Sequence, residues 1–510
     1  MKITSEDGVL KELKKLKNKK STGLDGISSF VLKLAAKEIT PSLTYIINKS
    51  IIDKVFPSSW KVAKVIPLFK KGDKSLPDNY RPISLLPVVS KVLERVIHVQ
   101  LLNYLNENDL LALEQSGFRP MHSTQTTLAK VTDDWLDAMS RQCYTGVVFV
   151  DLRKAFDTVD HNILLQKMAC IGVSCSSIKW FKEYLSDRKI VTQINNTLSS
   201  KENISYGVPQ GSILGPLMFI IYINDIVKQI KNCSIHLYAD DTVLYYSDTN
   251  PDTVQKHLQE DLNSIYDWMC RNKLSMNCKK TVCMLIGNRK ILNKHNDLDL
   301  KVNAQKLDQV AQIKYLGITV DEELNWNAQV EGVCKKVSKM ISFMGRLRQI
   351  VPEKYTKLIY DSMILPQLEY ADIIWDSCKN KHADVIQNLQ NRAGRIILKI
   401  SPFLHTPNQT VHKMLKWDTL ACRRKQHLLQ LVYKAVNGIT PSYLQDMFCF
   451  KDNTYLLRSD YNIAVKIPKN NYAKRMISYR GGVEFNELPV RLKRAPTLDS
   501  FKQGLKEHCL

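Results

Sequence analysis

Two adjacent carboxylates, Asp240 and Asp241, stand between apolar, β-forming runs at 234–237 and 242–246. This pattern predicts a hairpin with the two acids at its turn. Adjacent carboxylates on a rigid turn repel each other, and a hard divalent cation such as Mg²⁺ would relieve that repulsion through oxygen ligands. The pair alone is also typical of a solvated turn, because Asp favours turns by local hydrogen bonding. A metal site therefore requires further acids from elsewhere in the chain.

A third acid, Asp151, ends the apolar run at 147–150. A charge at the end of a buried strand costs free energy unless it is paired or metal-bound, although an Asp that simply faces water is the alternative. Because Asp151 and Asp240 each follow an apolar strand, we expect both at one edge of a single sheet. Three carboxylates there would hold two Mg²⁺ ions, which is the arrangement that in-line phosphoryl transfer between nucleotides requires.

The composition favours a large globular protein with a polyanionic partner. The chain has 510 residues, of which 44% are hydrophobic and 24% charged, and this length predicts two to four domains. The net charge of +23 favours nucleic acid as a partner, with an unusually basic globular protein as the alternative. The excess of positive charge is not confined to one tail. Residues 401–510 hold eighteen basic and eight acidic residues, a net charge of +10, so the first 400 residues carry the remaining +13.

The cysteines and apolar stretches indicate the compartment. Twelve cysteines without a Cys-x-x-Cys pair argue against a disulfide framework and a zinc ribbon. The first twenty residues do not resemble a signal peptide, and the longest apolar stretch, 214–223, is shorter than the ~20 residues that span a bilayer. We therefore expect an intracellular protein of the nucleus or cytoplasm, with no membrane or lipid partner.

Hydrophobic periodicity predicts the elements that position the acids. The segment with three prolines, 77–87, is expected to be irregular. Asp160 is expected to cap the N-terminus of the helix at 161–172. Strands are expected at 60–69, 146–152, 189–195 and 281–287, with a further pair formed by 301–302 and 313–320. Helices are expected at 7–20, 29–52, 88–107, 161–172, 177–186, 215–230 and 252–273, followed by three helices within 325–400.

Seven blocks in order resemble the signature blocks of reverse transcriptases. Phe-Val-Asp-Leu-Arg-Lys-Ala-Phe-Asp at 149–157 and Tyr-Ala-Asp-Asp at 238–241 resemble two of them. The order of the blocks and their amino-acid sequences are similar to those in the reverse transcriptases of non-long-terminal-repeat retrotransposons, in the LINE-like, jockey-type branch. The resemblance covers about residues 15–330, and the tail at 485–489 and 500–502 is similar to that branch as well. The remaining blocks lie at 79–86, 115–119, 207–216, 274–281 and 315–318.

The resemblance implies an α+β fold of the right-hand polymerase type, with an antiparallel palm sheet. Fingers would cover 1–140, the palm 141–325 and a helical thumb 326–400. The basic, mixed region 401–510 would be either an RNA-contacting surface or a structural extension. The oligomeric state is left open.

The resemblance also implies roles for the acids. Asp151, Asp240 and Asp241 would bind two Mg²⁺ ions, or Mn²⁺ as an alternative, with the Leu152 carbonyl as an additional ligand. Lys280 would donate a proton to the leaving pyrophosphate, and its neighbour Lys279 is the alternative.

Other residues would contact the nucleotide or the primer. Phe156 would lie under the sugar and exclude a 2′-hydroxyl, although core packing alone would also explain it. Arg81 would contact the triphosphate, while Gln210 and Gly211 would lie along the nascent base pair. The primer grip would consist of Tyr315, Leu316 and Gly317.

The expected function is RNA-directed DNA synthesis from an RNA template, a DNA primer and deoxynucleoside triphosphates. The main alternative is a catalytically silent nucleic-acid-binding remnant of such an element. An intron-encoded splicing enzyme is a weaker alternative, because the region after the polymerase blocks does not resemble a maturase. The loop at 22–26 lies in the first fingers block of the family, and because only about twenty residues precede that loop, we expect no endonuclease ahead of it.

Overall fold

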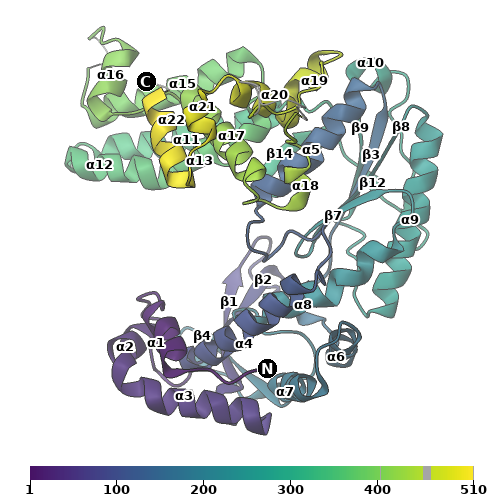
Figure 1. Cartoon of the computed structure of the whole chain (residues 1–510), viewed down its shortest axis with the longest axis vertical. Coiled ribbons are helices and arrows are strands. Elements are labelled where there is room, and N and C mark those ends of the chain that lie inside the picture. The colour runs from purple at the N-terminus through teal and green to yellow at the C-terminus, as the bar shows by residue number, and fades with distance from the viewer. Residues whose placement is uncertain (402–403, 452–460, 509–510) are drawn as a thin grey trace.

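The chain follows an arc with a sheet at its bend (Figure 1). A computed structural model describes residues 1–401, 404–451 and 461–508. The N-terminal helices belong to one arm of the arc, and the helices that follow residue 326 form the other (Figure 1). Within the described ranges, no helix is long and apolar enough to cross a membrane.

The five-stranded sheet at the bend carries the predicted acids. Its order is β12-β9-β3-β8-β7. The neighbours β9, β3, β8 and β7 are antiparallel, as predicted, whereas β12 pairs with β9 in parallel and departs from the prediction. After β9 the chain passes through a short helix and the hairpin at 301–306, and it then returns to the sheet edge as β12, which runs in the same direction as β9. The strands are β3 (Tyr144–Val150), β7 (Ser234–Tyr238), β8 (Asp241–Asp248), β9 (Val282–Ile286) and β12 (Asp308–Gln309).

The central strand β3 is buried along its whole length because helices cover both of its faces. Val148 and Val150 face a core with α9 (Pro251–Arg271), while Val147 and Phe149 face a core with α5 (Thr124–Ser140). The two helices are seen on either side of the sheet in Figure 1. Asp151 therefore follows a strand that is held rigidly from both sides.

A second sheet, in the arm with the N-terminus, has the order β2-β1-β4-β5, with β6 also paired to β4. The prediction that 77–87 is irregular is wrong, because β2 (Tyr80–Leu85) pairs along β1. Pro82 lies opposite Pro67, beyond the part of β1 that pairs with β4. Prolines are tolerated there because an edge strand leaves some of its N–H groups unpaired. The other strands are β1 (Val62–Phe69), β4 (Arg188–Ile194), β5 (Thr197–Leu198) and β6 (Glu202–Ile204).

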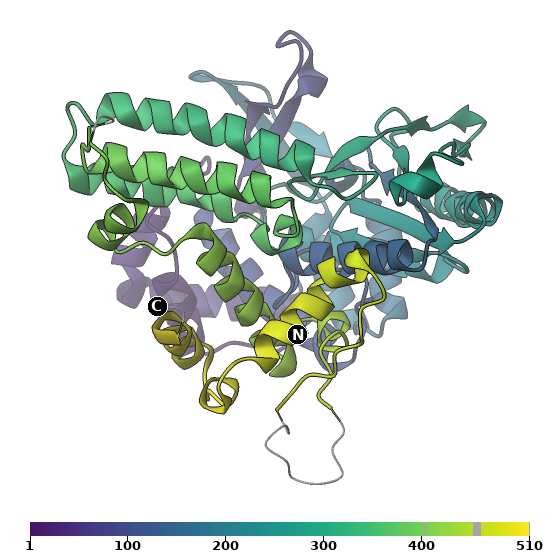
Figure 2. The ribbon, with the colours of Figure 1, turned by 90° about the horizontal axis from the view of Figure 1, so that it is seen from above.

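The helices of the other arm share one core with the α5 face of the central sheet. Figure 2 shows its long helices lying side by side, and α11 packs along α15. At the start of α20, the backbone N–H groups of Ile477 and Ser478 donate to the carboxylate of Asp133 on α5. The described part of 401–510 is thus packed into the same body as 326–400. The long helices are α11 (Asn327–Leu347), α15 (Asn380–Ile397), α17 (Leu420–Val436), α20 (Ile477–Asn486) and α22 (Leu498–His508).

The three helices expected at 325–400 are five α-helices with a π-helical turn at Tyr360–Ile364. Pro366 follows this turn, and proline lacks the N–H that would continue a regular α-helix. The shorter helices between α11 and α15 are α12 (Glu353–Ile359), α13 (Leu365–Glu369) and α14 (Asp372–Trp375).

Several helices are shorter than predicted. The helix predicted at 7–20 ends at Lys14 as α1 (Glu6–Lys14), because the lysines that follow would repel one another on a helix surface. The segment 29–52 is broken between α2 (Ser29–Leu34) and α3 (Ala36–Asp53). The helix α8 (Leu214–Ile223) continues only as a 3₁₀ turn. The predictions for α4 (Val88–Glu107), α6 (His161–Cys170) and α7 (Cys175–Leu185) are confirmed within a few residues.

The predicted pairing of 301–302 with 313–320 is wrong, because each segment closes its own tight hairpin. Lys301–Val302 pairs with Gln305–Lys306, and Gln312–Tyr315 pairs with Ile318–Asp321. Both turns have two residues with positive φ, which suits the right-handed twist of a hairpin. Local closure therefore replaces the long-range pair.

Candidate active site

The turn between β7 and β8 carries two of the three predicted acids. Tyr238 pairs with Asp241, so Ala239 and Asp240 form a two-residue turn. Ala239 adopts φ 57, a conformation that is unfavourable for a residue with a side chain. Burial raises the pKa of Asp240, and the charge of Asp151 raises it further. The hairpin therefore holds its carboxylates where they resist ionisation.

Asp241 shows the same effect more strongly. Burial, together with the charges of Asp240 and Asp151, raises its pKa to about 6, although the residue keeps part of its surface open to solvent. The positive charge of Lys70, at the end of β1, opposes these contributions. A carboxylate whose pKa responds to two others lies near both of them.

Asp151 is held by the loop that precedes β9. The side-chain nitrogen Nδ2 of Asn277 donates to Oδ2 of Asp151 at 2.9 Å, and the backbone N–H of Asn277 donates to the Asp151 carbonyl at 2.8 Å. Nζ of Lys280 lies 3.7 Å from the same Oδ2. The hydroxyl of Thr281 accepts from the Asp151 N–H at 3.2 Å. The loop thereby brings Lys280 beside the acid.

The donor set suits a hard divalent cation. The three side chains offer only oxygen atoms. Burial and neighbouring negative charge raise the pKa of Asp240 and of Asp241, and a cation would relieve that repulsion. Leu152 lies next to them, buried against Met276 through an isolated β-bridge. Throughout the part of the chain that the structure describes, no three acidic, His or Cys side chains are gathered tightly enough to form a ready-made metal cluster. The oxygen donors and negative charges of Asp151, Asp240 and Asp241 nevertheless fit Mg²⁺ or Mn²⁺.

The predicted nucleotide residues lie on the segments that follow Asp151 and precede α8. The Phe156 ring is half-buried and stacks on Phe219, with ring centroids 4.6 Å apart. The side-chain nitrogen of Gln210 donates to both carboxylate oxygens of Asp157, at 2.9 and 3.0 Å. The amide oxygen of Gln210 is therefore turned away from Asp157 and can accept a hydrogen bond.

Gly211 allows a close approach between that loop and β2. It adopts φ 125, and a Cβ there would lie 2.4 Å from the Ser84 carbonyl oxygen. The Ser84 N–H also donates to the Gln210 carbonyl at 2.8 Å. The Arg81 side chain comes from the same strand, and its charge, like that of Lys70, lowers the pKa of Asp240. The second sheet thus directs positive charge toward the acids.

The predicted primer grip is the hairpin between β13 (Gln312–Tyr315) and β14 (Ile318–Asp321). The Tyr315 ring is buried against Phe149. Leu316 and Gly317 form the turn, where the Tyr370 hydroxyl donates to the Leu316 carbonyl at 2.7 Å. Any contact with a ligand would therefore come from the turn, because the Tyr315 side chain faces the core.

Four site residues lie outside the roles predicted from the sequence. Asn277 and Asp157 orient Asp151 and Gln210, and both lie within blocks that carry the resemblance. Gln115 accepts a hydrogen bond from the Ala239 N–H, and Gly117 packs against the Ala239 backbone. Asp160 has the predicted role, since its carboxylate accepts from the Ile163 N–H at 3.0 Å and caps α6.

Comparison with known proteins finds similarity to reverse transcriptases. Residues 69–320 match the family model described as reverse transcriptase (RNA-dependent DNA polymerase). The chain is 30% identical over 435 residues to the probable RNA-directed DNA polymerase from transposon BS of Drosophila melanogaster, covering 82% of this chain and 47% of the relative. It is 28% identical over 396 residues to the RNA-directed DNA polymerase from mobile element jockey of the same fly, covering 75% and 42%.

A more distant relative is the Pol polyprotein from the type-1 retrotransposable element R2 of Popillia japonica. It is 24% identical over 245 residues, which cover 45% of this chain and 33% of the relative. The chain spans about half the length of the curated relatives that it matches most strongly. All three acids lie inside the matched range 69–320. The chain therefore carries a reverse transcriptase domain and is related to the RNA-directed DNA polymerases of jockey-type, non-long-terminal-repeat retrotransposons.

Proposed function

We propose that this chain is an RNA-directed DNA polymerase that adds deoxynucleotides to the 3′-hydroxyl of a primer. The observation that carries the proposal is the placement of Asp151 beside the Asp240–Asp241 turn, where Val150 pairs with Thr242 and where burial and the charge of Asp151 raise the pKa of Asp240 and of Asp241. Two carboxylate-bearing strand ends at one sheet edge are what two-metal nucleotidyl transfer needs. A reverse transcriptase domain over 69–320 supports the same conclusion.

Asp151, Asp240 and Asp241 would hold two Mg²⁺ or Mn²⁺ ions, with the Leu152 carbonyl as an additional ligand. When bound, these ions would activate the 3′-hydroxyl and neutralise the charge on the departing phosphates. Asn277 orients Asp151 by donating to Oδ2, which leaves the other carboxylate oxygen for a ligand. Lys280, whose Nζ lies 3.7 Å from Asp151, is the proposed proton donor to the pyrophosphate.

The incoming deoxynucleotide would lie between the sheet of the first arm and the carboxylates. Phe156 would pack under the sugar, and its stacking on Phe219 holds the ring in place against a 2′-hydroxyl. The free amide oxygen of Gln210 would accept from the nucleotide, while Gly211 keeps the loop close to β2. Arg81 would contact the triphosphate through its guanidinium group.

The template and primer would bind between the arms of the arc. In this assignment, residues 1–140 are the fingers, 141–325 the palm and 326–400 the thumb, and the hairpin turn with Leu316 and Gly317 grips the primer. The net charge of +23 supports nucleic-acid binding and predicts a strong dependence on salt.

Primer extension tests the proposal. Wild-type protein and Asp151→Asn are compared at low salt with Mg²⁺, dTTP and an oligo(dT) primer on poly(rA). We expect extension by the wild type only. Failure of the wild type to extend would favour the alternative of a silent nucleic-acid-binding remnant, and equal extension by both proteins would show that the metal ligands are assigned wrongly.

A further inference from the structure

The catalytic turn is supported from outside the sheet by a segment at residues 114–117, which we name the brace. The brace runs along the edge strand β7 and forms a parallel bridge between Gln115 and Leu237. The Ser116 N–H donates to the Leu237 carbonyl at 2.8 Å, and the Leu237 N–H donates to the Glu114 carbonyl at 2.9 Å. The brace thus acts as a short further strand directly before the turn.

Gln115 carries this support into the turn itself. Its side chain is fully buried, and Oε1 accepts from the N–H of Gly117 at 2.7 Å and of Ala239 at 3.0 Å. Ala239 has the unfavourable φ of 57, so a bond to its N–H helps to hold a conformation that the residue would otherwise leave. The position of Asp240, the next residue, therefore depends on the brace.

Gly117 brings the backbones of the brace and the turn together. A Cβ at this position would lie 2.2 Å from the Ala239 nitrogen and 2.8 Å from its Cα. Only glycine allows this approach, because both of those atoms belong to the backbone. A displacement of the brace would therefore move the turn as well.

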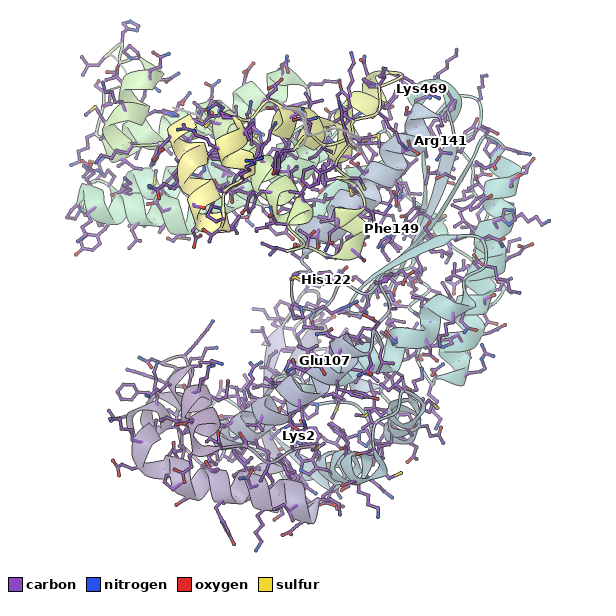
Figure 3. All side chains as sticks on the ribbon, in the orientation of Figure 1. Lys2, Glu107, His122, Arg141, Phe149 and Lys469 are labelled. Atoms are coloured by element: carbon purple, nitrogen blue, oxygen red, sulfur yellow. The ribbon has the colours of Figure 1, made fainter. Side chains whose placement is uncertain are left out.

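One tyrosine of the C-terminal region contacts the brace. The Tyr443 hydroxyl, on α18 (Ser442–Gln445), lies 3.0 Å from the Ser116 hydroxyl and 3.3 Å from that of Thr126 on α5. Its ring meets the rings of His236 on β7 and His122 edge-on, with centroids 5.9 and 6.0 Å apart. His122 lies in the middle of the arc, between its two arms (Figure 3).

We propose that the C-terminal region is a positioning part of the catalytic centre, in which Tyr443 clamps the brace against β7 and thereby fixes the Ala239–Asp240 turn. The inference rests on the proposed polymerase function and extends it to a region outside the matched range 69–320. Tyr443 touches the elements behind the turn, and its effect reaches the reacting atoms through Ser116, Gln115 and Ala239. A purely structural extension would affect folding stability alone.

Three variants separate the two roles. Tyr443→Phe removes the hydroxyl and keeps the ring, and Tyr443→Ala removes both. The matched control is Tyr433→Phe. The hydroxyl of Tyr433 on α17 donates to the carbonyl of Ala495, which precedes α22, at 2.6 Å. Each full-length protein is measured for kcat, for KM of dTTP, for the Mg²⁺ concentration that gives half-maximal rate, and for Mn²⁺ affinity by electron paramagnetic resonance without turnover.

We expect Tyr443→Phe to lower kcat by about fivefold, which corresponds to one lost hydrogen bond. Tyr443→Ala should lower it further, and both should weaken Mn²⁺ binding and raise the Mg²⁺ requirement with KM for dTTP unchanged. Tyr433→Phe should keep wild-type kinetics and metal affinity. Wild-type kcat and Mn²⁺ affinity in both Tyr443 variants would overturn the inference. If the wild type extends no primer, the proposed function fails; the Mn²⁺ affinities of the two Tyr443 variants still test the clamp, and wild-type affinity in both would overturn it.

Discussion

Replacing Gly117 by alanine should misplace the catalytic turn. The added Cβ would lie 2.2 Å from the Ala239 nitrogen, whereas comfortable contact between heavy atoms needs about 3.5 Å. The turn or the brace must then move by about 1.3 Å. A misplacement of about 1 Å costs on the order of 100-fold in rate, so kcat should fall by about 100-fold, or about 2.7 kcal/mol in activation free energy.

The assay is single-turnover addition of one deoxynucleotide to a primer on an RNA template. Gly332→Ala is the matched control, because an added Cβ on that residue of α11 meets no atom within 4 Å. We expect the control to keep the wild-type rate, and circular dichroism to show that both variants are folded. A folded Gly117→Ala protein with the wild-type rate would refute the account of how the turn is positioned.

Three further predictions concern the acids and the nucleotide site. The pKa of Asp241 is raised to about 6 from 3.8, so its protonated form stabilises the metal-free fold, and that contribution is lost as the pH rises through about 6. Mg²⁺ should therefore raise Tm at about pH 7.5 and little at about pH 5, and at limiting Mg²⁺ the extension rate should fall as the pH drops through about 6. Asp157→Asn should raise KM for dTTP about fivefold in steady-state kinetics, because the Gln210 amide loses its charged partner; an unchanged KM would contradict this. Phe156→Val should raise the use of ribonucleotides relative to deoxynucleotides by about 10- to 100-fold in competition assays, and an unchanged ratio would remove the proposed role of the ring.

The parts of the site that the sequence predicts are those set by local patterns. Apolar runs that end in acids place Asp151 after β3 and Asp240 at a turn, and the structure confirms both strands. Asp160 caps α6 as expected, because capping depends on residues three positions apart. Antiparallel pairing of β7 with β8 follows from the short turn between them, whereas the antiparallel arrangement of the other long strands is predicted only by the family resemblance.

The parts that sequence reasoning misses depend on contacts between distant segments. Gln115 bonds to Ala239 across 124 residues, and Asn277 bonds to Asp151 across 126. No periodicity or spacing signals such a pair before the fold brings its members together. The strand β2 is missed for a different reason, since its proline is tolerated only where the strand lies at a sheet edge.

The most direct test of the central claim is the rate of single-nucleotide addition by Asp240→Asn on an RNA template with Mg²⁺. Asn has nearly the same shape as Asp and lacks its charge, so the change removes the charge of the proposed metal ligand with little change in packing. The control is Asp299→Asn, whose carboxylate pairs with Lys306 and Lys301 away from the turn. We predict a loss on the order of 1,000-fold for Asp240→Asn and the wild-type rate for the control. A wild-type rate in Asp240→Asn would contradict the assignment of this turn as the catalytic centre.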